Sequence, residues 1–77
     1  MAGKRLTNTI RTLRFMAGEM TQAELGTRVG LTRQTIAAIE QGKYAPSLET
    51  AFRIADAFGV GLEEVFRWQS EGDGASG

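Results

Sequence analysis

The apolar residues between positions 21 and 43 form two short sets with helical spacing. Leu25 and Val29 lie four residues apart and Ile36 and Ile39 lie three apart, so each pair falls on one face of a helix. Two such faces that meet at a steep angle share one small core. The pattern therefore predicts two short helices joined by a tight turn, with the second helix presented at the surface.

Glycine and threonine mark the limits of these two helices. A side chain at Gly26 would intrude on the helix crossing, and Gly30 can adopt the left-handed conformation that ends the first helix. Thr21 and Thr32 stand at the expected N-cap positions. This arrangement leaves residues 33–35 as the exposed first turn of the second helix.

The same spacing predicts a helix before this pair, over residues 8–17. Ile10, Leu13 and Ala17 lie on one stripe of that helix, and Gly18 is expected to end it. The preceding residues, 1–6, show no periodicity and are interpreted as an N-terminal arm. Such an arm either frays, reaches phosphate groups with its basic residues, or contributes a short strand.

Two further helices are predicted toward the C-terminus. The first, Ser47–Phe58, follows Pro46 and opens with an approximate capping box in which Thr50 replaces the usual Glu or Gln. The expected core stripe of this helix consists of Leu48, Ala51, Ile54, Ala55 and Phe58. A short fifth helix is expected from Leu62 to Phe66.

The apolar residues near the C-terminus exceed what a small core can cover. A chain of 77 residues forms one domain whose core is marginal unless a partner shares it. Val65, Phe66 and Trp68 are therefore candidates for a two-fold interface in which one small core completes another. The alternative is that they form a lid on the core of a single chain.

Composition excludes several classes of site. The chain has no cysteine, which excludes disulfides and thiolate metal sites and fits a reducing compartment. It has no histidine, so acid–base catalysis near neutral pH would need carboxylates or lysines with a shifted pKa. No apolar run is long enough to span a bilayer, and no signal-peptide core is apparent, so we expect a cytoplasmic protein.

The formal net charge of zero conceals a polarised chain. Residues 1–44 hold seven Lys and Arg against three Glu, a balance of plus four, and residues 45–77 hold two Arg against six acidic residues, a balance of minus four. Because the local field of one face governs phosphate binding, a neutral total does not exclude a nucleic-acid partner. The acidic remainder would mainly limit non-specific attraction.

The stretch TQAELGTRVGLTRQTIAAIEQGK, residues 21–43, resembles the helix-turn-helix of the Cro/C1 family, also called the xenobiotic-response-element family. Gly26, Gly30 and the apolar residues Ile36 and Ile39 stand where that family places them. The stretch KYAPSLETAFRIADAFGVGLEEVFRWQ is similar to the small stand-alone branch that includes the cytolysin repressor, so the resemblance covers roughly residues 8–69. It implies an all-α, compact five-helix DNA-binding domain over residues 7–69, followed by a flexible tail at 70–77.

The resemblance also implies two contacts between distant segments. The first is a short antiparallel pairing of Leu6–Asn8 with Phe66–Gln69. The second is an ion pair between Arg14 and Glu40, which would lock the second helix of the motif against its support. The segment RFMAGEMTQ carries one residue more before Thr21 than the commonest family spacing, and a longer turn there would displace Arg14.

Residues at the start of the second helix would face base edges if that helix enters the major groove of DNA. Arg33 can form a bidentate contact with guanine and Gln34 one with adenine, and the methyl group of Ala38 can contact a thymine methyl. We rank Gln34 first, because an arginine at a helix start can swing to a phosphate instead. The candidates for base contact are Thr32, Arg33, Gln34, Thr35 and Ala38.

Contacts to the phosphate backbone are implied by the resemblance for Gln22, Gln41 and Lys43, with Arg28 and Tyr44 as weaker candidates. Gln22 opens the first helix of the motif, whose N-terminal amides and dipole suit a phosphate. Lys43 lies just past the second helix, where the duplex backbone should pass.

The sequence thus predicts a homodimeric, sequence-specific regulator of transcription, most simply a repressor that reads an inverted repeat in double-stranded DNA. Its half-site centres would lie about one helical turn apart, roughly 10 to 10.5 bp. The alternative is an antitoxin or a restriction-modification controller that acts through a protein partner, although the C-terminal EGDGASG has no apolar anchor for one. An enzyme is the least expected class, with no cofactor or metal, because Glu63 and Glu64 point apart on a helix and no metal-ligand cluster appears.

Overall fold

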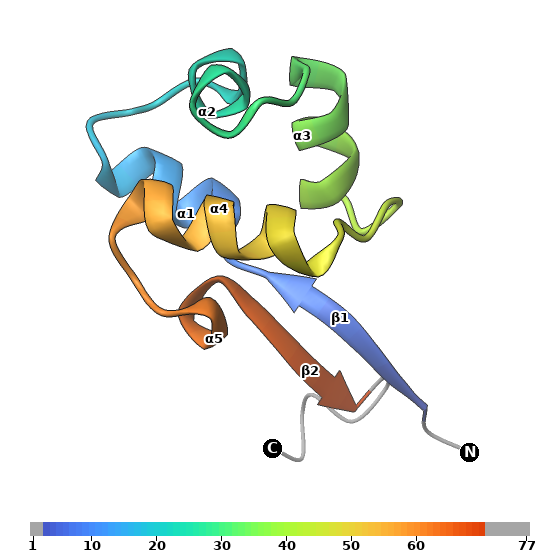
Figure 1. The fold of residues 1–77 in the computed structure, drawn as a ribbon. Helices are drawn as coiled ribbons and strands as arrows, with labels where there is room; N and C mark the ends of the chain where they lie inside the picture. Colours follow the sequence, from blue (N-terminus) through green and yellow to red (C-terminus); the bar gives the residue numbers. More distant parts are fainter. Residues whose placement is uncertain (1–2, 71–77) are drawn as a thin grey trace.

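The computed structural model describes residues 3–70 of the chain. In chain order the elements are β1 (Lys4–Asn8), α1 (Ile10–Met16), α2 (Gln22–Val29), α3 (Arg33–Glu40), α4 (Leu48–Phe58), α5 (Leu62–Val65) and β2 (Phe66–Ser70). Figure 1 shows α2 and the start of α3 at one end of the molecule and the two strands at the other, with α1 and α4 between them. The helices of the described residues are too short and insufficiently apolar to cross a membrane.

The fold is not purely helical, because the two ends of the described chain pair as strands. β1 and β2 run antiparallel, with Lys4 opposite Ser70 and Asn8 opposite Phe66. The predicted pairing is therefore present, and it begins at Lys4 rather than at Leu6. The predicted N-terminal arm covered residues 1–6, but residues 4–6 lie in the sheet. The predicted tail covered residues 70–77; Ser70 is the last residue of β2, and residues 71–77 lie outside the described part.

The helix α1 begins at Ile10, two residues later than predicted, because Asn8 belongs to β1. The side chain of Asn8 lies over the helix start, where its Oδ1 accepts a hydrogen bond from the Ile10 backbone N–H at 3.1 Å. Thr9, the N-cap residue, donates its hydroxyl hydrogen to the Glu64 carbonyl at 2.6 Å. Since the helix ends at Met16, Ala17 is exposed and does not join the predicted stripe.

One hydrophobic core joins all five helices and the start of β2. Its residues are Ile10, Met20, Leu25, Val29, Ile36, Ile39, Ala51, Ile54, Ala55, Val65 and Phe66. The apolar pairs predicted for the two central helices are all among them. Leu48, which the sequence placed in the α4 stripe, is instead 68% exposed. It lies in the first turn of α4 and lines a surface hollow with Leu6, Pro46 and Leu62.

The apolar residues near the C-terminus divide into buried and exposed positions. Val65 is fully buried and Phe66 is 8% exposed within the single chain, whereas Trp68 is 65% exposed. The first two therefore cover the core of their own chain, as in the lid alternative. A contact with a second chain would have to rest on Trp68, which pairs with Leu6 across the sheet.

Candidate nucleic-acid interface

The start of α2 is closed by a capping box between Thr21 and Glu24. The Thr21 Oγ1 accepts from the Glu24 backbone N–H at 3.0 Å, and the Glu24 Oε1 accepts from the Thr21 backbone N–H at 2.7 Å. These bonds satisfy two of the amides that a helix start leaves unpaired. The pKa of Glu24 lies below its ordinary value of 4.5, chiefly because the Thr21 backbone N–H favours the charged carboxylate.

A tight turn separates α2 from α3 and lies directly against Gly26. Gly30 takes φ 78° and ends α2, and the Leu31 backbone N–H donates to the Gly26 carbonyl at 2.8 Å. A Cβ atom at Gly26 would lie 2.5 Å from the Leu31 carbonyl oxygen. The prediction that a side chain at Gly26 would clash is therefore confirmed, and the group it would clash with is the backbone of the turn. Figure 1 shows the resulting steep crossing, with α2 seen nearly end-on and α3 from the side.

The first turn of α3 is capped on one side and open to solvent on the other. The Thr32 Oγ1 accepts from the Thr35 backbone N–H at 3.1 Å, and the two hydroxyl oxygens lie 3.0 Å apart. Thr32, Arg33 and Gln34 are exposed, while Thr35 and Ala38 are half-buried. On the opposite face, Ile36 and Ile39 lie in the core. One face of α3 is thus anchored, and the face with the predicted base contacts is presented.

Three of the five predicted base contacts line one shallow hollow on the open face of α3. The hollow is formed by Leu31, Gln34, Thr35, Ala38 and Tyr44, and Arg33 does not line it. From the sequence, Leu31 has no predicted role in DNA contact, and Tyr44 is predicted to contact only a phosphate. Leu31 lies in the turn before α3, so helical spacing gives no signal for its place in the hollow. An apolar side chain at this position is suited to a thymine methyl group.

The predicted ion pair between Arg14 and Glu40 is present and joins α1 to the end of α3. The Arg14 Nε donates to the Glu40 Oε2 at 2.6 Å, and the Arg14 Nη2 donates to Oε1 at 3.1 Å. A third contact was not predicted: the Gln22 Nε2 donates to the Glu40 Oε1 at 3.2 Å. The carboxylate therefore links α1, α2 and α3 at one point.

The longer turn between α1 and α2 does not displace Arg14. The Arg14 Nη1 donates to the Met20 carbonyl at 2.8 Å, and the Met20 backbone N–H donates to the Arg14 carbonyl at 2.9 Å. Gly18 and Glu19 both take positive φ angles, 86° and 58°, which fold the additional residue back toward the helix. The extra residue is absorbed within the turn.

Two of the predicted phosphate contacts share a polar cleft between α1, α2 and α3. Gln22 and Gln41 line this cleft together with Arg11, Arg14 and Glu40. The sequence reasoning did not assign Arg11 to the site, although its position three residues before Arg14 was the available signal. Because Glu40 balances Arg14, Arg11 is the cation in this cleft for which no ion-pair partner is seen among the described residues.

Lys43 lies outside that cleft, beyond the end of α3. Gly42 takes φ 77°, its backbone N–H donates to the Ile39 carbonyl at 3.0 Å, and the Lys43 backbone N–H donates to the Ala38 carbonyl at 2.9 Å. This left-handed turn ends α3 and leaves the side chains of Lys43 and Tyr44 exposed.

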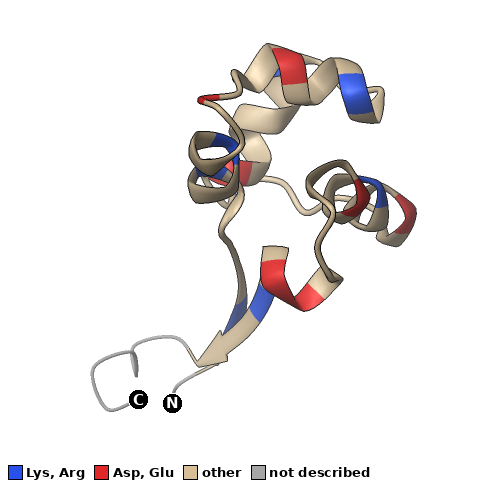
Figure 2. Cartoon of the chain, turned by 90° about the vertical axis from the view of Figure 1, so that its left-hand side faces the viewer, with Lys and Arg blue, Asp and Glu red and all other residues tan. Residues whose placement is uncertain are grey.

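The charges do not separate simply according to the two halves of the chain. Lys4 and Arg5 belong to the basic half, but they lie in β1, beside β2 with its Arg67. In Figure 2 the blue positions of the strands lie near the red positions of α5, away from α2 and α3. The exposed basic residues of α1, α2, α3 and the turn after α3 are therefore a smaller set, Arg11, Arg28, Arg33 and Lys43.

The helix α3 is capped, follows a tight turn, exposes a polar first turn and is bonded to two neighbouring helices at its end. These features define a helix-turn-helix DNA-binding domain. A family model described as helix-turn-helix matches residues 10–65 of the chain. The chain belongs to this Cro/C1-type family of helix-turn-helix transcriptional regulators, which makes it a DNA-binding protein rather than an enzyme.

Curated relatives agree with this assignment, and a solved structure shares the fold. An uncharacterized HTH-type transcriptional regulator of Methanocaldococcus jannaschii is 50% identical over 52 residues, which cover 68% of this chain and 79% of the relative. The uncharacterized HTH-type transcriptional regulator YgzD of Bacillus subtilis is 48% identical over 64 residues, which cover 83% of this chain and 94% of the relative. A crystal structure of a Bacteroides fragilis protein matches the fold with a TM-score of 0.70 at 21% identity, covering 80% of this chain and 98% of that one. The narrower similarity to the cytolysin repressor stays a prediction.

Proposed function

We propose that this regulator is a homodimeric repressor that binds an inverted repeat in double-stranded DNA and occludes a promoter in the cytoplasm. The main observation in support is that one face of α3 is held in the core while its first turn is exposed to solvent. Ile36 and Ile39 anchor one face in the core, and Glu40 ties the end of the helix to two neighbours. The exposed first turn is therefore presented rigidly, which is what base-specific hydrogen bonds require.

Base recognition is proposed for the residues that line the hollow on α3. Gln34 is the first choice, because its amide can donate to and accept from the edge of an adenine, and the apolar wall beside it suits the methyl group of a thymine. Arg33 is exposed outside the hollow, where it can reach either a guanine or a phosphate. Thr32 and Thr35 already share a hydrogen bond, so their hydroxyl groups keep only part of their capacity for DNA.

Phosphate binding is proposed at two places around α3. Gln22, Gln41 and Arg11 line the cleft between α1, α2 and α3, and Lys43 lies just past the end of α3. Contacts of this kind position the domain on the duplex without reading its sequence. They also make the affinity fall as salt is raised.

A homodimer is proposed from the apolar surface around the sheet. Trp68 is exposed next to Leu6, and Leu6 also borders the hollow formed by Pro46, Leu48 and Leu62. A contiguous apolar surface that includes an exposed tryptophan is a common feature of protein interfaces. In a two-fold dimer it would place one α3 on each half of an inverted repeat.

The test is selection of bound duplexes from a random DNA pool with the purified full-length chain at two salt concentrations. The proposal predicts enrichment of one inverted repeat whose half-site centres lie about 10 to 10.5 bp apart, or a whole multiple of that spacing. If no sequence is enriched and all binding disappears at the higher salt concentration, sequence-specific recognition is contradicted and only attraction to the DNA backbone remains.

A further inference from the structure

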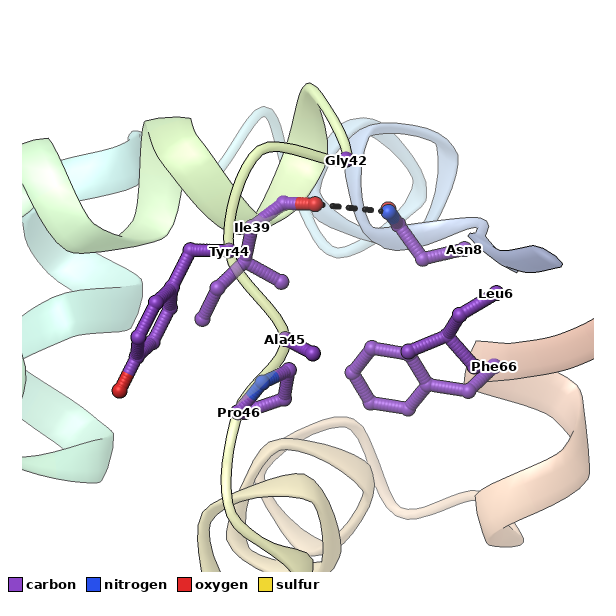
Figure 3. Close-up of a pocket in the computed structure, with 8 residues that line it drawn as sticks. All are labelled: Leu6, Asn8, Ile39, Gly42, Tyr44, Ala45, Pro46 and Phe66. Carbon is purple, nitrogen blue, oxygen red and sulfur yellow. Dashed lines mark hydrogen bonds between the residues drawn. The ribbon is translucent and has the colours of Figure 1, made fainter.

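Asn8 joins the sheet to the end of α3 through its side-chain amide. The Asn8 Nδ2 donates to the Ile39 carbonyl at 3.0 Å and lies 3.5 Å from the Glu40 carbonyl. These carbonyls belong to the last turn of α3, where a helix leaves its acceptors without intrahelical partners. The Ile39 carbonyl also accepts from the Gly42 backbone N–H of the following turn at 3.0 Å, so Asn8 adds a second donor there. Figure 3 shows the Asn8 amide pointing at the Ile39 carbonyl from the strand side. The side chain therefore acts as a C-terminal cap supplied by another element.

The same side chain also holds the start of α1. Its Oδ1 accepts from the Ile10 backbone N–H, and its backbone lies in the sheet opposite Phe66. One residue thus connects β1, the first turn of α1 and the last turn of α3. Because every polar atom of the amide has a defined partner, rotation of this side chain would break bonds at two helix ends at once.

The space around Asn8 is closely filled, which keeps the sheet in one position against α3. Leu6 and Phe66 of the sheet line one side of a small cavity, and Ala45 and Pro46 of the following loop line the other (Figure 3). The cavity has a volume of about 40 Å³. Such a space can hold only water, so it is a small gap between packed residues and not a ligand site.

We propose that Asn8 sets the distance and angle between the two recognition helices of the dimer. The inference rests on the proposed homodimer, in which the strand pair Leu6 and Trp68 meets the second chain. Asn8 lies two residues after Leu6 in the same strand and donates a hydrogen bond to the last turn of α3. The position of each α3 relative to the two-fold axis therefore depends on this amide in addition to the shared core, and Asn8 is a positioning residue that touches no DNA.

Half-site spacing is the property that such a residue controls. A change of one base pair rotates a half-site by about 35° and moves it by about 3.4 Å along the duplex. A stiff link between the sheet and α3 rejects that change, because both domains can no longer bind at once. A loose link tolerates it.

The experiment compares the full-length chain with three variants on duplexes that carry the selected inverted repeat. Asn8→Ser keeps a hydroxyl that can accept from the Ile10 N–H but is too short to reach Ile39. Asn8→Asp keeps the shape and the acceptor but removes the donor. The matched control, Thr9→Val, removes the neighbouring hydroxyl bond to the Glu64 carbonyl and leaves α3 untouched.

Dissociation constants are measured for spacings from two base pairs shorter to two longer, and for a duplex with a single half-site. We expect the wild type and Thr9→Val to bind the selected spacing about tenfold or more tightly than its neighbours. Binding two sites at once can raise affinity by more than this. In Asn8→Ser this preference falls to about threefold or less, while affinity for the single half-site stays within about twofold, because that duplex requires no fixed spacing. Asn8→Asp gives the same result, and circular dichroism shows which variants are folded.

Two results would overturn the inference, and they differ from each other. If folded Asn8→Ser keeps the wild-type preference, whatever its melting temperature, Asn8 has a structural role only and the proposed function stands. If the wild type itself binds every spacing no more tightly than the single half-site, the homodimer is contradicted, and the role of Asn8 is contradicted with it.

Discussion

Arg14 in α1 and Glu40 at the end of α3 form a two-point ion pair, with N–O distances of 2.6 and 3.1 Å. Their side chains are only 15% and 8% exposed, so water screens the pair weakly. The pair holds the recognition helix to a helix that carries none of the predicted base contacts. The ability of α3 to present its first turn therefore depends on α1 as much as on α2.

Loss of either partner of this pair should destabilise the chain, and loss of both should cost less than the sum of the two single losses. Glu40→Leu leaves a guanidinium without its carboxylate, and Arg14→Met leaves the carboxylate without its cation, so each should lower the free energy of unfolding by about 2 to 4 kcal/mol. The double variant should lose clearly less than the sum, because no unpaired charge remains. Urea denaturation of the four proteins measures this coupling. Strictly additive losses would show that the pair contributes nothing.

Gly26→Ala should destabilise the domain through the turn rather than through the helix. The new Cβ would lie 2.5 Å from the backbone oxygen of Leu31, which cannot move without opening the turn. We expect a loss of about 2 kcal/mol or more, within the range of steric overpacking. Gly61→Ala is the matched control, because its φ of −77° suits alanine and its nearest neighbours are the flexible side chains of Glu63 and Glu64. Equal melting temperatures for the two variants would contradict this view of the turn.

The capping box at Thr21 predicts a specific acid sensitivity. The folded-state pKa of Glu24 lies below its ordinary value of 4.5, so its contribution to stability is fully present above that value and is lost as the pH falls through the lowered pKa. Glu24→Gln cannot titrate there. The difference in unfolding free energy between wild type and variant should be constant near neutral pH and should shrink from about pH 4.5 downward. A difference that grows in acid would mean that the carboxylate is not the stabilising form.

Local rules accounted for most of the helix-turn-helix. Thr21 and Thr32 cap their helices and Gly30 ends the first one, because each of these features depends on residues within four positions along the chain. The core pairs followed from helical spacing for the same reason. The ion pair of Arg14 with Glu40 came from family resemblance, since no local pattern relates residues 26 positions apart.

The features missed by the sequence reasoning depend on contacts between distant segments. Helical spacing placed Asn8 at the start of a helix while the resemblance placed it in a strand, and its pairing with Phe66 shows that the strand is correct. Leu48 matched the helical stripe, yet the first turn of α4 has no element over it in the described chain to bury it. Gln22 was assigned to a phosphate alone because its bond to Glu40 forms only when α2 and α3 cross.

Trp68→Ala should dissociate the proposed dimer without unfolding the chain. The indole is 65% exposed in the single chain, so its removal costs the protomer little. As a central apolar anchor it should weaken dimerisation by about 30-fold or more, the range of an interface hot spot. Sedimentation velocity over a concentration series measures the change. Phe15→Ala, at an equally exposed aromatic of α1, is the control, and a dimer unaffected by Trp68→Ala would place the interface elsewhere.

The reading of bases by Gln34 is the central claim, and affinity for operator duplexes changed at one base pair at a time tests it most directly. In the wild type, one base pair of each half-site should contribute about 1 to 3 kcal/mol through this side chain. Gln34→Ala should bind all four base pairs equally at that position and keep its preferences elsewhere, whereas Gln41→Ala should weaken binding to every duplex alike. If Gln34→Ala keeps the full wild-type preference at every position, α3 does not read DNA through this residue and the account is wrong.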